Sequence, residues 1–202
     1  MSLNHPISLP RAILFDMDGT LTEPFIDFVR LKAEMGIASQ PILETLAAMN
    51  GSDRERAEAV LHRHEEEAAV TSTLNPGCME LLEWVAMRGI STALITRNTR
   101  RSVATVLARH GLSFDILVTR DDCRHKPHPD PLHLALEAFQ TPPYDAWMVG
   151  DGHYDVEAGR AADVRTVWIS HGRERDFSTE PWRVAVGLPE LTALLRGCLV
   201  RE

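Results

Sequence analysis

Five short apolar runs recur along the chain and are separated by segments with helical patterning. The runs span residues 12–15, 91–95, 114–118, 146–149 and 164–169. Strands that are almost continuously apolar are buried on both faces, and parallel strands need helices to connect them. The alternation therefore predicts an α/β fold, a doubly wound parallel sheet with helices on both sides.

The interval between the first and second runs breaks this rhythm. Residues 23–74 carry three helical stretches, at 25–36, 41–50 and 52–74, and no run typical of a strand. Asn75-Pro76-Gly77 then forms a turn signal that returns the chain to the sheet. We therefore expect a small α-helical insertion of residues 23–74 after the first strand, with residues 1–22 and 75–202 forming the α/β core.

Composition limits the kinds of partner. The chain has 202 residues, 44% of them apolar, which fits one domain with a modest insertion. A formal net charge of −8 argues against nucleic acid as a partner, and no apolar run approaches the roughly 20 residues of a membrane span. The N-terminus lacks a signal-peptide pattern, and the scattered cysteines Cys78, Cys123 and Cys198 do not suggest a disulfide framework. We expect a cytoplasmic protein.

Polar residues gather where the predicted strands end. In open α/β sheets, ligands bind beyond the carboxyl ends of the strands, so chemistry should appear at these positions. Four strands are followed by such residues: Asp16 and Asp18, then Thr96 to Asn98, then Arg120 to Lys126, then Asp151 and Asp155. The pattern predicts one polar site at a single sheet edge.

The four carboxylates indicate a cation. Either pair alone could be explained by turns and helix caps, in which an aspartate accepts backbone N–H groups. Asp16 and Asp18 are separated by one residue in a glycine-containing loop, and Asp155 lies four residues after Asp151, which suits one face of a helix. Four carboxylates at one edge would repel each other without a cation, and Mg²⁺ prefers such hard oxygen ligands.

Thr96 and Lys126 complete the predicted site. A hydroxyl at a strand end, followed by the N–H groups of a helix N-terminus, can bind an anion, although a plain helix cap is the simpler reading of Thr96 alone. Lys126 lies in a proline-rich loop, where its ammonium would offset carboxylates and a phosphate. Taken alone, it would be read as a solvated surface lysine.

These residues together carry a resemblance to a known family. The ordered set is Phe15–Leu21 (FDMDGTL), then Thr96 after a strand, then Lys126-Pro127, then Gly150–Asp155 (GDxxxD). It resembles the haloacid dehalogenase superfamily, whose core is a Rossmannoid α/β sheet. The helical insertion after the first motif is similar to the small helical cap of the phosphoglycolate-phosphatase-like branch.

The resemblance implies a role for each residue. Asp16 would be the nucleophile that forms an aspartyl-phosphate, and Asp18 would protonate the leaving group and then activate water. Asp16, the main-chain carbonyl of Asp18, Asp151 and Asp155 would bind Mg²⁺, with Asp155 acting through water or by orienting Lys126. The phosphoryl oxygens would be held by Thr96, Lys126 and the amides of Arg97 and Asn98.

Asp18 separates two reactions of this superfamily. Dehalogenases lack the second acid because halide leaves without a proton, so Asp18 favours phosphate esters. The resemblance thus implies a Mg²⁺-dependent phosphatase for a small phosphorylated metabolite, with phosphoglycolate as one option. A phosphomutase or phosphotransferase on the same core, or a catalytically silent binding domain, is the alternative. The sequence leaves the particular ester and the oligomeric state open.

Overall fold

The computed structural model describes residues 8–24, 26–37 and 40–199. Its centre is a six-stranded sheet with the order β3-β2-β1-β4-β5-β6, in which every pair of neighbours is parallel. The strands are β1 (Ala12–Phe15), β2 (Ser91–Ile95), β3 (Ile116–Val118), β4 (Ala146–Gly150), β5 (Arg165–Ile169) and β6 (Arg183–Ala185). The predicted doubly wound α/β fold is confirmed.

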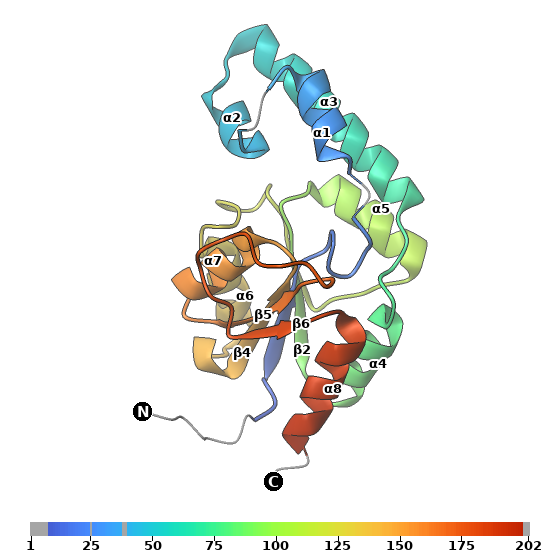
Figure 1. Cartoon of the computed structure of the whole chain (residues 1–202), viewed down its shortest axis with the longest axis vertical. Helices are drawn as coiled ribbons and strands as arrows, with labels where there is room; N and C mark the ends of the chain where they lie inside the picture. Colours follow the sequence, from blue (N-terminus) through green and yellow to red (C-terminus); the bar gives the residue numbers. More distant parts are fainter. Residues whose placement is uncertain (1–7, 25, 38–39, 200–202) are drawn as a thin grey trace. The chain divides into compact units, whose positions relative to one another are not determined.

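Helices cover both faces of this sheet. Helices α6 (Asp130–Phe139) and α7 (His153–Ala161) pack on one face, and α4 (Cys78–Met87) and α8 (Leu188–Leu199) contact each other on the opposite face (Figure 1). A short 3₁₀ helix, η1 (Pro143–Asp145), leads into β4. All residues of β1 and β4 are buried, as expected for central strands covered on both sides.

The order of the strands determines where a site can form. The chain proceeds outward from β1 through β2 to β3, and then returns to place β4 on the other side of β1. Such a reversal opens a crevice at the carboxyl ends of the two strands that flank it. Phe15 pairs with Leu94 of β2 and with Val149 of β4, so Asp16 follows in register with the ends of both neighbours.

The predicted strands agree with the observed ones within two residues at each end, but one strand was not predicted. Strand β6 has three residues, two of them exposed, and it follows β5 without an intervening helix. Neither a buried apolar run nor the strand-helix alternation could therefore identify it.

The chain divides into two compact units. One contains the sheet and consists of residues 1–23, 73–100 and 113–202, and the other contains residues 24–72 and 101–112. The second unit is helical, with α1 (Phe28–Met35), α2 (Ile42–Ala48), α3 (Gly51–Thr71) and most of α5 (Arg100–His110). Helix α5 follows β2 in the chain, yet it groups with the helices that precede β2, which chain order alone does not predict.

The helical unit has its own apolar cluster and a polar network. Leu31, Met35, Leu46 and Leu61 are among its buried residues. Beside them, the carboxylate of Glu34 accepts hydrogen bonds from α1 and α3, from Arg30 Nε (2.8 Å), Arg63 Nη2 and His64 Nε2 (3.0 Å). Among the described residues, no helix is both long enough and apolar enough to span a membrane.

Candidate active site

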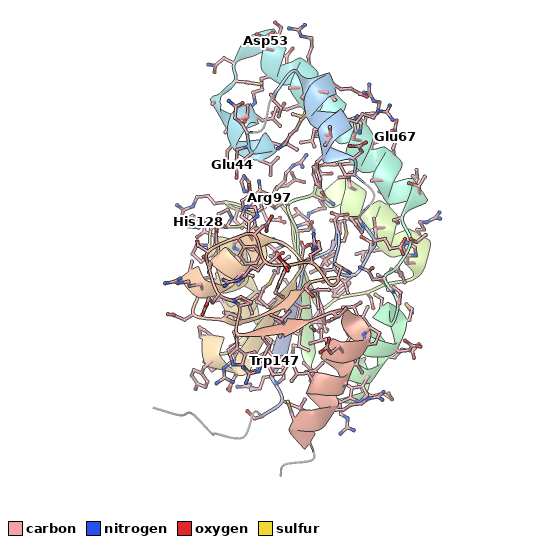
Figure 2. The ribbon with its side chains drawn as sticks, viewed as in Figure 1. Glu44, Asp53, Glu67, Arg97, His128 and Trp147 are labelled. Atoms are coloured by element: carbon pink, nitrogen blue, oxygen red, sulfur yellow. The ribbon has the colours of Figure 1, made fainter. Side chains whose placement is uncertain are left out.

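Residues from four strand ends meet at the carboxyl edge of the sheet. Figure 2 labels Arg97 and His128 at this end and Trp147, near the start of β4, at the other. Oxygens of the Asp16, Asp151 and Asp155 carboxylates lie within 4.8 Å of one another, and this is the one such acidic group among the described residues. The strand ends identified from the sequence therefore do converge in space.

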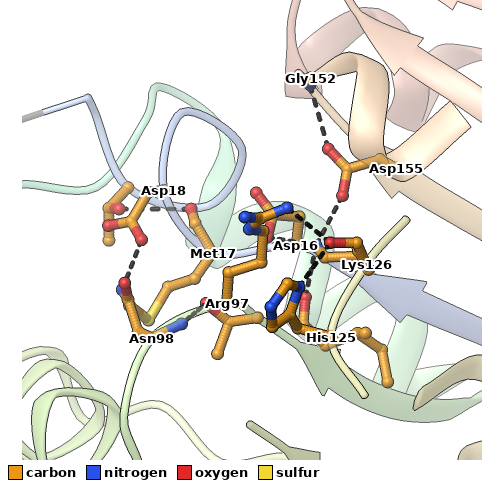
Figure 3. Close-up of polar contacts among 12 residues, drawn as sticks. Asp16, Met17, Asp18, Arg97, Asn98, His125, Lys126, Gly152 and Asp155 are labelled. Atoms are coloured by element: carbon orange, nitrogen blue, oxygen red, sulfur yellow. Dashed lines mark hydrogen bonds and ion pairs between the residues drawn. The ribbon is translucent and has the colours of Figure 1, made fainter. Parts of the chain in front are cut away.

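Lys126 lies at the centre of this group. Its side chain is 2% exposed, and its ammonium donates to Asp16 Oδ1 (2.6 Å), to Asp155 Oδ1 (2.5 Å) and to the carbonyl of Ile95 (2.7 Å) (Figure 3). Three acceptors match the three N–H groups of an ammonium. Lys126 is therefore a buried, fully hydrogen-bonded cation and not a solvated surface lysine.

The electrostatics of the group show a surplus of negative charge. Burial raises the pKa of Asp16 well above its ordinary value, Lys126 opposes this, and the charges of Asp155 and Asp151 add to it. Burial and Asp155 likewise raise the pKa of Asp151. Burial alone would lower the pKa of Lys126, but Asp155 and Asp16 outweigh it, so Lys126 keeps its charge. The more exposed Arg173 also pairs with Asp151 (3.0 Å) and partly offsets the rise in its pKa. Three carboxylates against these two cations still form a site that a metal cation would stabilise.

Two glycines allow the carboxylates to approach the backbone. Gly19 has φ +78°, and a Cβ there would lie 2.5–2.7 Å from the carboxylate atoms of Asp151. A Cβ at Gly150 would overlap the carboxylate of Asp155. Asp155 also accepts the N–H of Gly152 at the start of α7 (3.0 Å), so it caps this helix and bonds Lys126 at the same time.

Asp18 lies apart from the acidic group. Its Oδ2 accepts a hydrogen bond from Asn98 Nδ2 (2.5 Å), which joins the loops that follow β1 and β2 (Figure 3). Asn98 N–H also donates to Thr96 Oγ1 (3.1 Å), so the β2 loop is folded back on the strand end. The carboxylate of Asp18 thus bonds Asn98, whereas that of Asp16 bonds Lys126, although the two aspartates are separated by a single residue.

Arg97 contributes to the shape of the β2 loop. Its Nη1 donates to the carbonyl of Lys126 (2.6 Å), and its guanidinium lies 3.9 Å from the ring centroid of Tyr154. His125 Nδ1 contacts the same Lys126 carbonyl at 3.0 Å. These contacts bring Arg97 close to the buried lysine, and they fix the main chain of the loop that carries it.

Comparison with known proteins agrees with this geometry. Residues 10–163 match the family model of the haloacid dehalogenase-like hydrolases. The chain belongs to this family. A phosphoglycolate phosphatase from Pseudomonas savastanoi pv. phaseolicola is 30% identical over 224 residues, covering 95% of this chain and 80% of that protein. Pyrophosphatase PpaX from Oceanobacillus iheyensis is 27% identical over 180 residues, covering 79% of this chain and 83% of that protein.

The fold of this haloacid dehalogenase-like hydrolase also matches solved structures. A hydrolase from Pseudomonas syringae aligns with a TM-score of 0.80 at 22% identity, covering 92% of this chain and 97% of that one. The predicted superfamily and its phosphoglycolate-phosphatase-like branch are confirmed. So is the enzyme class, a phosphoric monoester hydrolase.

Two residues at the edge of the hydrolase site were missed by sequence reasoning. His171 and Arg173 follow β5, and their side chains bond the carbonyl of Gly19 (2.5 Å) and the carboxylate of Asp151 (3.0 Å). The sequence carries the signal, because Ser170 to Arg173 are polar residues or glycine directly after a strand, as at the other four strand ends. The same criterion applied to residues 170–173 identifies both.

Proposed function

We propose that the protein is a Mg²⁺-dependent phosphatase that hydrolyses a small phosphate monoester through an aspartyl-phosphate on Asp16. The observation that carries this proposal is the buried contact of Lys126 with both Asp16 and Asp155, within a group of three carboxylates. A buried ammonium holds the nucleophile in one orientation and reduces its repulsion of an incoming phosphate.

The acidic group fits a magnesium ion. Its donors are hard oxygens, and the raised pKa values of Asp16 and Asp151 follow from burial and neighbouring negative charge. Asp16, Asp151 and the main-chain carbonyl of Asp18 would hold the ion, and Asp155 would assist through water or by orienting Lys126. When bound, Mg²⁺ would neutralise charge on the phosphoryl oxygens and orient the phosphate for attack.

In the first half-reaction, an Asp16 carboxylate oxygen attacks phosphorus and forms an O–P bond as the bond to the leaving oxygen breaks. Asp18 donates a proton to that oxygen, so the leaving group departs as an alcohol. Asn98 bonds the Asp18 carboxyl, whereas Lys126 bonds those of Asp16 and Asp155, so the proposed acid and the proposed nucleophile have separate hydrogen-bond donors among these contacts.

In the second half-reaction, Asp18 accepts a proton from water, and the resulting hydroxide oxygen attacks phosphorus. The O–P bond to Asp16 breaks, and phosphate and a free carboxylate are formed. Thr96, with the amides of Arg97 and Asn98, would bind phosphoryl oxygens during both steps. Because the three N–H groups of Lys126 already have acceptors, its contact with phosphate would replace the bond to Asp16 as that carboxylate loses its charge on attack.

The names of the relatives suggest a substrate class. Phosphoglycolate phosphatase and pyrophosphatase both act on small phosphorylated molecules, and we infer a small phosphorylated metabolite for this chain also. A panel of metabolite phosphates, with phosphoglycolate and pyrophosphate among them, would identify it by phosphate release.

Asp16→Asn tests the proposal directly. We expect Mg²⁺-dependent release of phosphate from an aryl phosphate by the unaltered protein and none above background by the variant. Asp163→Asn is the matched control, because this exposed residue has φ +56°, a conformation that asparagine tolerates. Turnover by Asp16→Asn would refute the nucleophile, and no turnover of any phosphate ester by the unaltered protein would refute the phosphatase.

Asp18→Asn tests the general acid. Turnover of alkyl phosphates should fall severely, and that of aryl phosphates less, because aryl leaving groups need less protonation. Equal losses on the two classes of ester would contradict this role.

A further inference from the structure

The turn after β5, residues 170–173, links the sheet edge to the acidic group. On one side, the N–H groups of Ser170 and His171 donate to the carbonyls of Ala185 (2.8 Å) and Val186 (3.0 Å) beside β6. On the other side, His171 Nε2 donates to the carbonyl of Gly19 (2.5 Å). Main-chain bonds to β6 and a side-chain bond to the loop after β1 therefore fix the turn that carries Arg173.

Arg173 reaches Asp151 through two contacts. Its Nη2 donates to the main-chain carbonyl of Asp151 (3.1 Å) and to its carboxylate Oδ2 (3.0 Å). Its Nε donates back to the carbonyl of Ser170 (3.0 Å), which holds the side chain in this direction. The Asp151 carbonyl also accepts from Trp168 Nε1 (2.8 Å), and Trp168 is buried in β5. β5 and its turn thus fix both the main chain and the carboxylate of Asp151.

Two side chains of the turn, those of His171 and Arg173, bond groups that lie next to each other. Gly19 is bonded by His171, and it lies so near Asp151 that a Cβ on it would collide with the carboxylate that Arg173 bonds. The nucleophile loop and the Asp151 loop are therefore held against each other by one four-residue turn.

We propose that Arg173 is a positioning residue that orients the carboxylate of Asp151 to bind the divalent cation. By holding Oδ2, the guanidinium fixes the rotation of the carboxylate, and Oδ1 would then be the oxygen offered to a cation. The proposal rests on the proposed function, because it requires a cation at Asp151. It assigns Arg173 no contact with substrate.

Two effects of the guanidinium oppose each other. Its positive charge repels a cation, but the side chain is 54% exposed, and in water at physiological salt this repulsion of a divalent ion changes affinity by about fivefold at roughly 5 Å. Orientation of a metal ligand by an outer hydrogen-bond partner changes metal affinity by about 10–100-fold. Orientation therefore outweighs repulsion, and removal of Arg173 should weaken binding of the metal.

Direct titration of Mg²⁺ by calorimetry, with no substrate present, tests the inference on the full chain. Because the lost repulsion offsets part of the lost orientation, we expect Arg173→Ala to weaken Mg²⁺ binding about 2–20-fold. The half-saturating Mg²⁺ concentration for turnover should rise in parallel, with kcat at saturating Mg²⁺ within a few-fold of the unaltered protein. Arg173→Lys should recover only part of the affinity, because a lysine lacks the planar guanidinium that spans the carbonyl and the carboxylate.

Arg175→Ala is the matched control. It removes the same charge from the same loop, where Arg175 bonds Ser178 and Glu180 instead of Asp151. Mg²⁺ affinity unchanged in Arg173→Ala, or weakened equally in Arg175→Ala, would overturn the role of Arg173 and leave the phosphatase proposal intact. No Mg²⁺ binding by an unaltered, folded protein would overturn the proposed metal site and this role with it.

Discussion

Replacement of Lys126 by methionine should destabilise the protein severely. Methionine has a similar length and keeps the apolar part of the side chain, so the change removes chiefly the ammonium. That ammonium is 2% exposed and bonds two carboxylates whose side chains are 13% and 4% exposed, those of Asp16 and Asp155. Removal of one partner from a buried ion pair leaves an uncompensated charge and costs about 3–5 kcal/mol.

The size of this loss of stability distinguishes a buried, paired Lys126 from a solvated one. A solvated lysine paired at the surface would contribute about 1 kcal/mol or less. For a domain of 150–250 residues, each kcal/mol shifts the melting temperature by about 2–4 °C, so a buried pair corresponds to a fall of about 6–20 °C. Melting curves in the presence of EDTA, followed by circular dichroism, measure this difference without a contribution from metal.

Two further variants make the measurement decisive. Lys32→Met removes the same charge from a half-buried lysine of α1, and its melting temperature should change by only a few degrees. Lys126→Met combined with Asp155→Asn removes both members of one pair, and it should be less destabilised than the sum of the two single variants. A loss below about 1 kcal/mol in Lys126→Met would refute the argument from burial.

Three other predictions concern stability. Gly19→Ala should lower the melting temperature and reduce turnover, because Gly19 has φ +78° and its Cβ would collide with the Asp151 carboxylate. Gly36→Ala is the control: this glycine has φ +71° but open space around it, so the change should cost only about 1–2 kcal/mol. Gly159→Ala should destabilise by about 1–3 kcal/mol, because its Cβ would overlap a threonine of β5, whereas Gly197→Ala in α8 should stabilise slightly; urea denaturation measures both. Hydrogen bonds from His64 and Arg30 lower the pKa of Glu34 to about 2. The contribution of Glu34 to stability is therefore present above about pH 4.5 and is lost as the pH falls toward 2. Between these pH values, the urea midpoint of Glu34→Gln should fall less than that of the unaltered protein.

Much of the candidate site could be predicted from the sequence because strand ends are visible in it. Apolar runs identify where strands stop, and parallel strands bring their carboxyl ends to one edge, so the sequence alone predicts that Asp16, Thr96 and Asp151 lie at one edge. What the sequence could not give was the direction of the side chains. The sequence shows Asp18 and Asp16 in one loop but not their partners: Asp18 bonds Asn98, and Asp16 bonds Lys126.

The parts that escaped prediction share a physical cause. β6 is short and half exposed, and it owes its pairing to the edge that β5 presents, which is a tertiary property. The grouping of α5 with the inserted helices depends on contacts such as Ser72 Oγ to His110 Nε2 (2.9 Å), between residues 38 positions apart. Patterns within a window of sequence carry no information about such pairings.

Lys126 also explains why the site and the sheet must form together. Its ammonium contacts groups that follow or end three different strands: Asp16 after β1, Ile95 at the end of β2, and Asp155 after β4. A one-residue slip of any of these strands would move its group by about 3.3 Å and turn its side chains to the other face. Such a slip would leave a buried charge without its partner. The same contacts that position Asp16, the proposed nucleophile, therefore stabilise the correct register of the sheet, and a protein in which they form is one in which these strand ends are aligned.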